Sequence, residues 1–227
     1  MKKKIIITGT SRGIGFELVK LLAAEGHQIL SLSRNKKPVE ALGLENVIAL
    51  RFDITKEENR KEVKGFVKAN WHTFDVLIHN AGAFLKNDFE KISQEKLRIV
   101  YETNVFGVYG LTQELLPLAK KETHIVAISS MGGIQGSVKF PELTAYSSSK
   151  AAVINLMEVL AEEYKETGPI FNALALGAVQ TQMFEEAFPG AEASLQPKEM
   201  ASYIANFALE ANKVFNGKVL QVSNSTP

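Results

Sequence analysis

The sequence predicts an α/β fold, with a doubly wound parallel sheet of about seven strands and helices on both faces. Two observations support this class. Short β-branched apolar runs alternate with helical patterns along the chain, and a glycine-rich loop joins the first run to the first helix. The 227 residues suffice for one large core and contain no repeat, low-complexity tract or linker. We therefore expect one domain over residues 1–227.

Composition excludes several classes of function. Hydrophobic residues make up 45% and charged residues 22%, and the net charge of +1 does not favour a nucleic acid or a membrane surface. The chain has no cysteine, so disulfides, thiol nucleophiles and thiolate metal sites are excluded, and its four histidines are scattered without metal-ligand spacing. The N-terminal apolar run stops at Thr8, too early for a signal peptide, and no run approaches a membrane span. We expect a cytoplasmic protein.

The first strand and helix frame a nucleotide-binding loop. Lys4–Thr8 is an apolar strand, Phe16–Glu25 has helical periodicity, and Gly26 ends the helix. The glycines between them let the backbone approach a pyrophosphate, which the helix N-terminus attracts. This unit is typical of the Rossmann fold, although the spacing is Gly-x-x-x-Gly-x-Gly; a structural turn is the alternative. The expected cofactor contacts are Gly9, Ser11, Arg12, Gly13, Ile14 and Gly15.

Residues after the second strand, Gln28–Ser33, indicate which dinucleotide binds. An acidic residue here would hydrogen-bond a ribose 2′-hydroxyl, but the chain continues with Arg34, and Arg12 is expected on the same side. Guanidinium groups without a carboxylate suit a 2′-phosphate. The sequence therefore favours NADP(H) over NAD(H), with a solvated basic loop as the alternative.

The next segments add cofactor contacts. A strand over Val47–Phe52 leads to Asp53 and Ile54, where the Asp53 carboxylate could bind the adenine amino group or serve only the loop. Thr55 to Glu58 fits a capping box for a helix over Lys56–Ala69.

A fourth strand, Val76–His79, precedes the small residues Asn80, Ala81 and Gly82, which allow a loop to lie against adenine and ribose. A long helical stretch is then expected over Ser93–Lys121. Asn104 lies in its middle, where asparagine is unfavourable; it is either a surface residue or a point where the helix opens to hold a water.

The second half continues the alternation. A strand over His124–Ser129 delivers Ser129 and Ser130 to the sheet edge where such folds place ligands. After the next strand, Gly177 begins a turn that can bring Val179 backbone and the Thr181 hydroxyl to an amide. The remaining expected elements are the loop Gly132–Thr144, the strand Ile170–Leu176, the loop-like segment Met183–Gln196, the helix Pro197–Leu209 and the strand Lys218–Val222.

Tyr146 and Lys150 are four residues apart, so a helix would place them on one face. A free tyrosine has a pKa of about 10, and a lysine ammonium about 4 Å away could contribute roughly 4 kcal/mol toward the phenolate. We therefore expect Lys150 to lower the pKa of Tyr146 and make it a proton donor and acceptor near neutrality. The spacing alone favours the alternative, an ordinary amphipathic helix that extends its lysine to solvent.

Taken together, these residues resemble the short-chain dehydrogenase/reductase family over nearly the whole chain. The matching pieces are the glycine loop from Thr8 to Gly15, Asp53-Ile54, Asn80-Ala81-Gly82, Asn104, Ser129-Ser130, Tyr146 to Lys150, and Gly177 to Thr181. The resemblance implies an enzyme that moves a hydride between a nicotinamide and a carbonyl or secondary alcohol.

It also implies roles for four catalytic residues. Tyr146 would be the general acid or base, and Ser130 would orient the substrate oxygen. Lys150 would bind the nicotinamide ribose and lower the Tyr146 pKa, and Asn104 would hold a water that links Lys150 to solvent. No metal is implied.

The resemblance further implies a small-molecule substrate that binds near residues 131–144 and 183–196, and a homodimer or homotetramer formed through about Asn104–Lys120 and Ala145–Glu166. The chain departs from the family pattern at His79, at Leu176, where proline is usual, and in a short segment at 183–196. A short lid would suit a bulky, flat or carrier-borne substrate. The alternatives are a dinucleotide-binding regulator without turnover, or an enoyl reductase or epimerase with the same residues.

Overall fold

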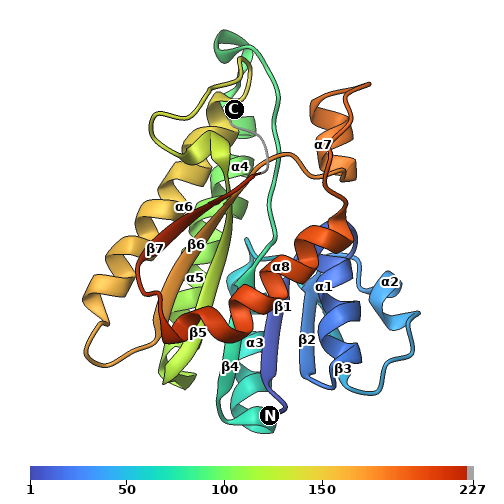
Figure 1. The fold of residues 1–227 in the computed structure, drawn as a ribbon, viewed down its shortest axis with the longest axis vertical. Coiled ribbons are helices and arrows are strands. Elements are labelled where there is room, and N and C mark those ends of the chain that lie inside the picture. The colour runs from blue at the N-terminus through green and yellow to red at the C-terminus, as the bar shows by residue number, and fades with distance from the viewer. Residues whose placement is uncertain (224–227) are drawn as a thin grey trace.

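The computed structural model describes residues 1–223 and contains one seven-stranded sheet (Figure 1). All paired strands are parallel, in the order β3-β2-β1-β4-β5-β6-β7. The strands are β1 (Lys4–Thr8), β2 (Gln28–Ser33), β3 (Val47–Arg51), β4 (Phe74–His79), β5 (Ala119–Ser130), β6 (Ile170–Leu176) and β7 (Lys218–Val222). The predicted fold class is therefore confirmed.

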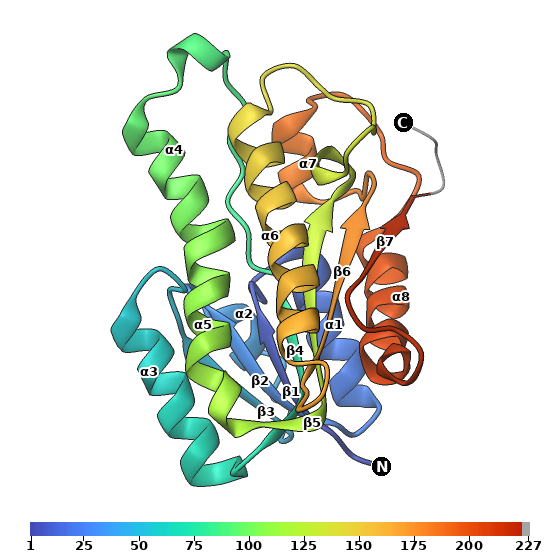
Figure 2. The ribbon, with the colours of Figure 1, turned by 90° about the vertical axis from the view of Figure 1, so that its left-hand side faces the viewer.

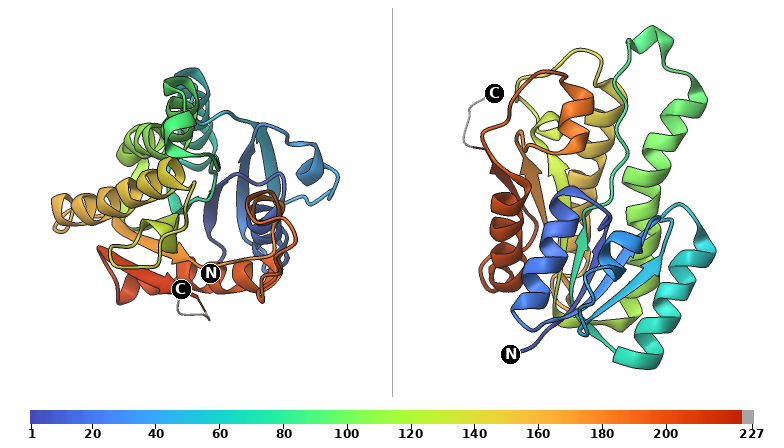
Figure 3. Two further views of the ribbon diagram at one scale, coloured as in Figure 1. Left: turned by 90° about the horizontal axis from the view of Figure 1, so that it is seen from above. Right: turned by 90° about the vertical axis from the view of Figure 1, so that its right-hand side faces the viewer.

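Helices cover both faces of the sheet (Figures 2 and 3). They are α1 (Gly13–Ala24), α2 (Lys37–Glu40), α3 (Glu57–Phe66), α4 (Gln94–Tyr101), α5 (Gly107–Leu115), α6 (Thr144–Glu163), α7 (Gln182–Ala187) and α8 (Pro197–Glu210). One apolar core joins α3, α5 and α6 to the sheet, and a second joins α1 and α8 to its other face.

The strand β1 shows why the sheet is buried on both sides. Ile5, Ile6 and Ile7 are all fully buried. Ile6 belongs to the core of α3, α5 and α6, whereas Ile5 and Ile7 belong to the core of α1 and α8. Each such side chain contributes about 1.5–3 kcal/mol on burial, and a continuous apolar run is what a doubly covered parallel strand requires.

The strand order places a binding crevice at the centre of the sheet. β1 pairs with β2 on one side and with β4 on the other, so the winding direction reverses between β1 and β4. Open α/β sheets bind ligands at the carboxyl ends of the strands beside such a reversal. The loops after β1, β4, β5 and β6 all begin at this edge, because the strands are parallel.

The predicted long helix over Ser93–Lys121 is divided. A π-helical turn over Glu102–Phe106 separates α4 from α5, and the prediction is wrong after Leu118, because Ala119 begins β5 beside Phe74. Pro117 lies in a short 3₁₀ turn at this boundary, since proline cannot donate the hydrogen bond that would continue a helix.

The predicted capping box at Thr55 is also wrong. α3 begins after Lys56, which has an extended backbone and no side-chain cap. The Thr55 hydroxyl instead donates to the Asp53 carboxylate at 2.8 Å. The helix predicted to reach Ala69 ends as an α-helix at Phe66. A π-helical turn over Val67–Trp71 follows it directly.

Within residues 1–223, no helix is both long and apolar enough to cross a membrane.

Candidate active site

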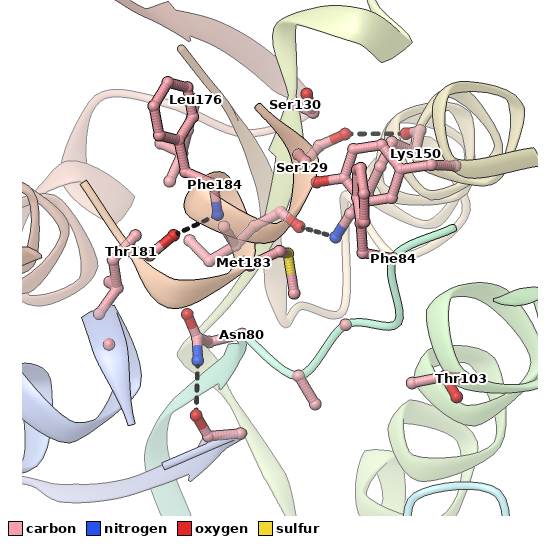
Figure 4. Close-up of a pocket in the computed structure, with 18 of the residues that line it drawn as sticks. Asn80, Phe84, Thr103, Ser129, Ser130, Lys150, Leu176, Thr181, Met183 and Phe184 are labelled. Carbon is pink, nitrogen blue, oxygen red and sulfur yellow. Dashed lines mark hydrogen bonds between the residues drawn. The ribbon is translucent and has the colours of Figure 1, made fainter. Parts of the chain in front are cut away.

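A cavity of about 1320 Å³ opens at the carboxyl edge of the sheet (Figure 4). Its volume exceeds the roughly 300–1,000 Å³ of a site for one drug-sized ligand, so it has room for two. The predicted site residues that line it are Gly9, Ser11, Arg12, Gly13, Ile14, Arg34, Asp53, Ile54, Asn80, Ala81, Gly82, Ser130, Tyr146, Lys150, Gly177, Val179 and Thr181. Gly15 and Asn104 do not line the cavity, because they lie behind its wall.

Tyr146 and Lys150 lie one turn apart on α6. Lys150 is buried, and its Nζ atom donates to the Ile128 carbonyl at 2.8 Å. The same Nζ atom is 5.7 Å from the centre of the Tyr146 ring. Ser129 at the end of β5 donates to the Lys150 carbonyl at 2.8 Å, so a strand end and a helix turn are joined behind the pair.

Ser130 faces Tyr146 from the last position of β5. Its hydroxyl is hydrogen-bonded to Tyr146 and also accepts from the Gly132 backbone N–H at 3.2 Å. Ser130 and Tyr146 therefore present two hydroxyl groups to the same part of the cavity. Such a pair can bind one oxygen atom of a ligand from two directions.

The predicted lowering of the Tyr146 pKa by lysine is wrong for this structure. Burial raises the pKa of Tyr146 to about 12, and the Ser130 hydrogen bond opposes the shift. Burial likewise lowers the pKa of Lys150 to about 8. Loss of water disfavours both charged forms, and the lysine contacts the Ile128 carbonyl rather than the phenol oxygen. The Tyr146 side chain is partly buried and borders the cavity.

Asn104 is buried in the π-helical turn between α4 and α5, so the surface alternative is wrong. Its Nδ2 atom donates to the Ala83 carbonyl and to Ser149 Oγ, both at 2.9 Å. Its Oδ1 atom accepts from the Ala83 backbone N–H at 2.7 Å. The helix does open at this asparagine, which thereby joins the loop after β4 to α6.

The glycine loop has the geometry of an anion site. Gly9 and Gly13 have positive φ angles of 74° and 59°. A Cβ atom on Gly15 would lie 2.3 Å from the Gly9 carbonyl oxygen, so the loop packs closely on α1. The N-cap of α1 is Arg12, whose side chain makes no cap, and the first turn holds no acidic residue. Its N–H groups are thus available to an anion.

Arg12, Arg34 and Asp53 all line the cavity. Arg12 Nη1 is 3.7 Å from Glu186 Oε1, an exposed pair. The Asp53 Oδ1 atom accepts from the Thr55 N–H at 3.0 Å as well as from its hydroxyl. One carboxylate oxygen of Asp53 is therefore engaged within its own loop.

Asn80 fastens the loop after β4 to the glycine loop. Its Nδ2 atom donates to the carbonyls of Thr8 at 3.1 Å and Gly9 at 3.0 Å, and Figure 4 shows the amide beside the strand. The backbone N–H groups of Asn80 and Ala81 both donate to Thr8 Oγ1 at 3.0 Å. The two predicted cofactor loops thus support each other.

The turn after β6 reaches the remaining side of the cavity. Val179 bridges to Leu195, and the Thr181 hydroxyl accepts from the Phe184 N–H at 3.1 Å as the N-cap of α7. The Thr181 hydroxyl is therefore in the cavity wall as predicted, but it caps the N-terminus of α7.

Sequence reasoning missed two residues of this site. Phe84 packs edge-on against Tyr146, with ring centres 5.1 Å apart and planes at 62°. Lys86 donates to the Ala187 carbonyl at 3.0 Å and lies 5.5 Å from the centre of the Phe188 ring. Both residues follow shortly after Asn80-Ala81-Gly82, and this position could have indicated that they lie near the site. A loop sequence, however, does not reveal where its side chains point.

Comparisons with known proteins agree with this geometry. The family model described as short chain dehydrogenase matches residues 3–192. The oxidoreductase UcpA of Salmonella typhimurium is 31% identical over 190 residues, which cover 81% of this chain and 72% of that protein. The 3-oxoacyl-(acyl-carrier-protein) reductase FabG of Staphylococcus epidermidis is 30% identical over 193 residues, covering 81% and 78%. The solved structure of ElxO with NADP bound has a TM-score of 0.85 at 26% identity, covering 98% of this chain and 97% of that one.

Proposed function

This chain belongs to the short-chain dehydrogenase family of oxidoreductases, and we propose that it uses NADP(H) to interconvert a carbonyl group and a secondary alcohol. One observation carries the proposal. Within a cavity large enough for two ligands, the Ser130 and Tyr146 hydroxyls are hydrogen-bonded to each other and Lys150 lies directly behind them.

The residues present fit a dinucleotide. The uncapped N-terminus of α1 and the positive φ angles at Gly9 and Gly13 suit a pyrophosphate. Gly82 lines the cavity without a side chain, in the loop beside Lys150 Nζ and Asn104 Oδ1. When bound, the nicotinamide supplies or accepts the hydride.

Tyr146 moves the proton. In reduction, the carbonyl carbon gains a hydride with its electron pair and the oxygen gains the Tyr146 proton; oxidation reverses both transfers. Ser130 donates to the same oxygen and fixes its orientation, so the hydrogen bond stabilises the negative charge that develops there. The Ile128 carbonyl holds Lys150 so that its ammonium stays beneath the Tyr146 ring.

Tyr146 ionises near neutral pH only when nearby positive charge lowers its pKa by more than burial raises it. A protonated Lys150 and the positive charge of an oxidised nicotinamide both favour the phenolate, in the opposite direction to the burial that raises the pKa of Tyr146. We therefore expect the Tyr146 pKa to be lower in the complex with oxidised cofactor than in the free protein.

NADP(H) is preferred because of the charge beside β2. Arg34 follows directly after β2, and both Arg34 and Arg12 line the cavity. Ser33 ends β2, where a carboxylate would repel a 2′-phosphate. ElxO, a structural neighbour at 26% identity, was solved with NADP bound, which supports this preference. Asp53 at the adenine end and the turn from Gly177 to Thr181 complete the proposed cofactor contacts.

The test is cofactor consumption. Purified protein is incubated with NADPH or NADH and a panel of ketones and aldehydes, and absorbance loss and products are recorded. We expect reduction to alcohols, with a lower KM for NADPH than for NADH. An equal or lower KM for NADH would contradict the cofactor preference.

The same assay separates the alternatives. Tight NADPH binding without turnover of any carbonyl would favour a regulator over an enzyme. A saturated C–C bond or an inverted centre among the products would instead indicate an enoyl reductase or an epimerase. No feature of residues 1–223 favours either reading. The cytoplasmic location also stays a prediction.

A further inference from the structure

The end of the cavity beyond Tyr146 is lined by aromatic rings from three separate segments. Phe84 comes from the loop after β4, Phe140 from the loop before α6, and Phe184 and Phe188 from α7 and its end. Each ring is only partly buried, and Phe140 is 49% exposed. Partly exposed rings in a concave wall leave apolar surface that a ligand can cover.

These rings are held in place before any ligand binds. The centre of the Phe188 ring lies 5.5 Å from that of Phe140, with the two ring planes at 66°. It lies 5.4 Å from that of Phe184, with the planes at 44°. Phe84 is fixed edge-on against Tyr146, and Figure 4 shows Phe84 and Phe184 on different sides of the hollow. Tilted contacts of this kind are favourable geometries for rings. The pocket therefore presents fixed ring faces next to the proton donor.

Charge at this end argues for a neutral ligand. None of the cavity-lining residues from 131–143 or 182–196 is charged. The charged residues of these two segments lie outside the lining and number four acids against one base: Lys139, Glu142, Glu185, Glu186 and Glu192. Two of the acids are paired, Glu142 with Lys86 and Glu186 with Arg12, so the lining from these two segments offers no charged partner to an ionic substrate.

The two nearby amines are also engaged by other groups of the protein. Lys139 Nζ donates to the Gly132 carbonyl at 2.8 Å, and Lys86 Nζ donates to the Ala187 carbonyl at 3.0 Å. Lys86 also lies 3.6 Å from Glu142 Oε2. Because both ammonium groups already have partners, neither is positioned to bind a substrate carboxylate or phosphate.

We propose that the substrate is a neutral ketone, aldehyde or secondary alcohol with an aromatic or similarly flat apolar ring near the reacting carbon. The ring lies among Phe84, Phe184 and Phe188 while the oxygen meets Ser130 and Tyr146. This inference rests on the proposed function and narrows it. Small polar carbonyls cannot cover the rings, and oxo acids and phosphorylated or carrier-borne substrates find no charged partner in the lining from residues 131–143 and 182–196.

A matched panel tests the inference. Benzylacetone carries the ring and no charge, benzylpyruvate adds a carboxylate, butanone lacks the ring, and acetoacetyl-coenzyme A represents carrier-borne substrates. With NADPH, we expect kcat/KM for benzylacetone to exceed that of each of the other three by about tenfold or more. Equal values for butanone, or a higher value for benzylpyruvate or acetoacetyl-coenzyme A, would overturn it.

Variants locate the effect. In Phe184→Ala, the ratio of kcat/KM for benzylacetone to kcat/KM for butanone should fall by about tenfold. The fall should come from a higher KM for benzylacetone, with kcat unchanged. Phe184→Leu, which keeps apolar volume at α7, should narrow it less. Phe89→Ala is the matched control, because Phe89 is 75% exposed and outside the cavity lining. An unchanged ratio in Phe184→Ala would contradict the assignment.

A binding measurement separates this inference from the proposed function. If no ketone is reduced, the proposed function fails, and saturation-transfer NMR on the NADPH complex then reads ring binding directly. Benzylacetone signals that weaken in Phe184→Ala would support the apolar pocket. Stronger signals from benzylpyruvate, or none from benzylacetone, would overturn it.

Discussion

Asn104 holds two segments of the site together through one side chain. It makes three hydrogen bonds, two to the Ala83 backbone and one to Ser149, in a buried position. Asn104→Ala would leave the Ala83 N–H and carbonyl unpaired, and an unsatisfied buried group costs about 1–3 kcal/mol. We expect a loss of that order in the free energy of unfolding, measured with urea.

The control for Asn104 is Asn70→Ala. Asn70 is exposed and makes one hydrogen bond, to the Phe66 carbonyl, at the end of a helix. Its replacement should change stability by less than about 0.5 kcal/mol. A similar loss in both variants would show that Asn104 has no special structural role.

Two buried histidines predict loss of stability in acid. His79 contacts Thr112 at 2.8 Å, and His124 donates from Nδ1 to the Ala208 carbonyl at 3.0 Å and accepts from Asn172 at 2.9 Å. Burial lowers the pKa of His79 to about 3 and of His124 to about 4. Unfolded histidine has a pKa of about 6.5, so below that pH the unfolded chain binds more protons.

Stability should therefore be complete above pH 6.5 and decrease as the pH falls toward 4. At pH 5, about 1.5 units below the unfolded pKa, each histidine contributes a loss of about 2 kcal/mol. Urea unfolding at pH 7 and pH 5 should differ by roughly 4 kcal/mol from this pair. His124→Asn should reduce the difference by about half. Equal stability at the two pH values would contradict the burial of both rings in neutral form.

At the scale of elements, α7 is fastened to the rest of the site by Lys86. One amine contacts the Ala187 carbonyl, the Phe188 ring and, at 3.6 Å, the Glu142 carboxylate. Lys86→Met should loosen α7, raise KM for the carbonyl substrate several-fold and speed proteolysis within residues 182–196. Global stability should change by less than about 1 kcal/mol, because the contacts are partly exposed.

Lys91→Met is the control for this element. Lys91 pairs with the exposed Asp88 in the same loop but has no contact with α7 in the described residues. It should leave KM and proteolysis of residues 182–196 unchanged. Identical effects in the two variants would mean that lost charge, and not the fastening of α7, is responsible.

The sequence predicts elements well where an apolar run ends in glycine or a charged residue. β1, β2 and β6 have their predicted bounds for this reason. The start of β5 was missed because Ala119 to Glu122 are polar or exposed residues whose pairing depends on Phe74, far away in the chain. Pairing of this kind is tertiary, and local pattern does not contain it.

The site divides in the same way. The glycine loop and the spacing of Tyr146 and Lys150 follow from sequence, because a short motif sets the backbone geometry. The direction of the Tyr146 pKa shift does not, because it depends on burial and on where the Lys150 amine points. The positions of Phe84 and Lys86 depend on loop conformation and could be found only in the structure.

At the scale of the whole molecule, exposed apolar side chains lie outside the cavity on α5, on α6 and in the π-helical turn before α5. Phe106, Tyr109 and Val159 are each more than half exposed. They lie on or next to the helices through which the sequence predicts association. Large apolar side chains left exposed on neighbouring helices suit a contact with another protein surface. We expect a homo-oligomer formed through this surface.

Light scattering should show a mass that is a multiple of the 25.0 kDa chain. Tyr109→Glu would place a charge in the contact and should shift the mass toward one chain, whereas Val214→Glu should not. Val214 is 78% exposed and lies outside these helices, in the segment before β7. A single-chain mass for the wild type would contradict the oligomer.

The central claim is that the Tyr146 hydroxyl passes the proton while the hydride moves. Tyr146→Phe removes that hydroxyl and keeps the ring that packs against Phe84. The most direct test is the single-turnover rate of NADPH oxidation in this variant, measured with bound cofactor and saturating ketone. We predict unchanged NADPH affinity and a rate lower by about 10²–10⁴-fold. A rate within a factor of about two of the wild type would contradict the account.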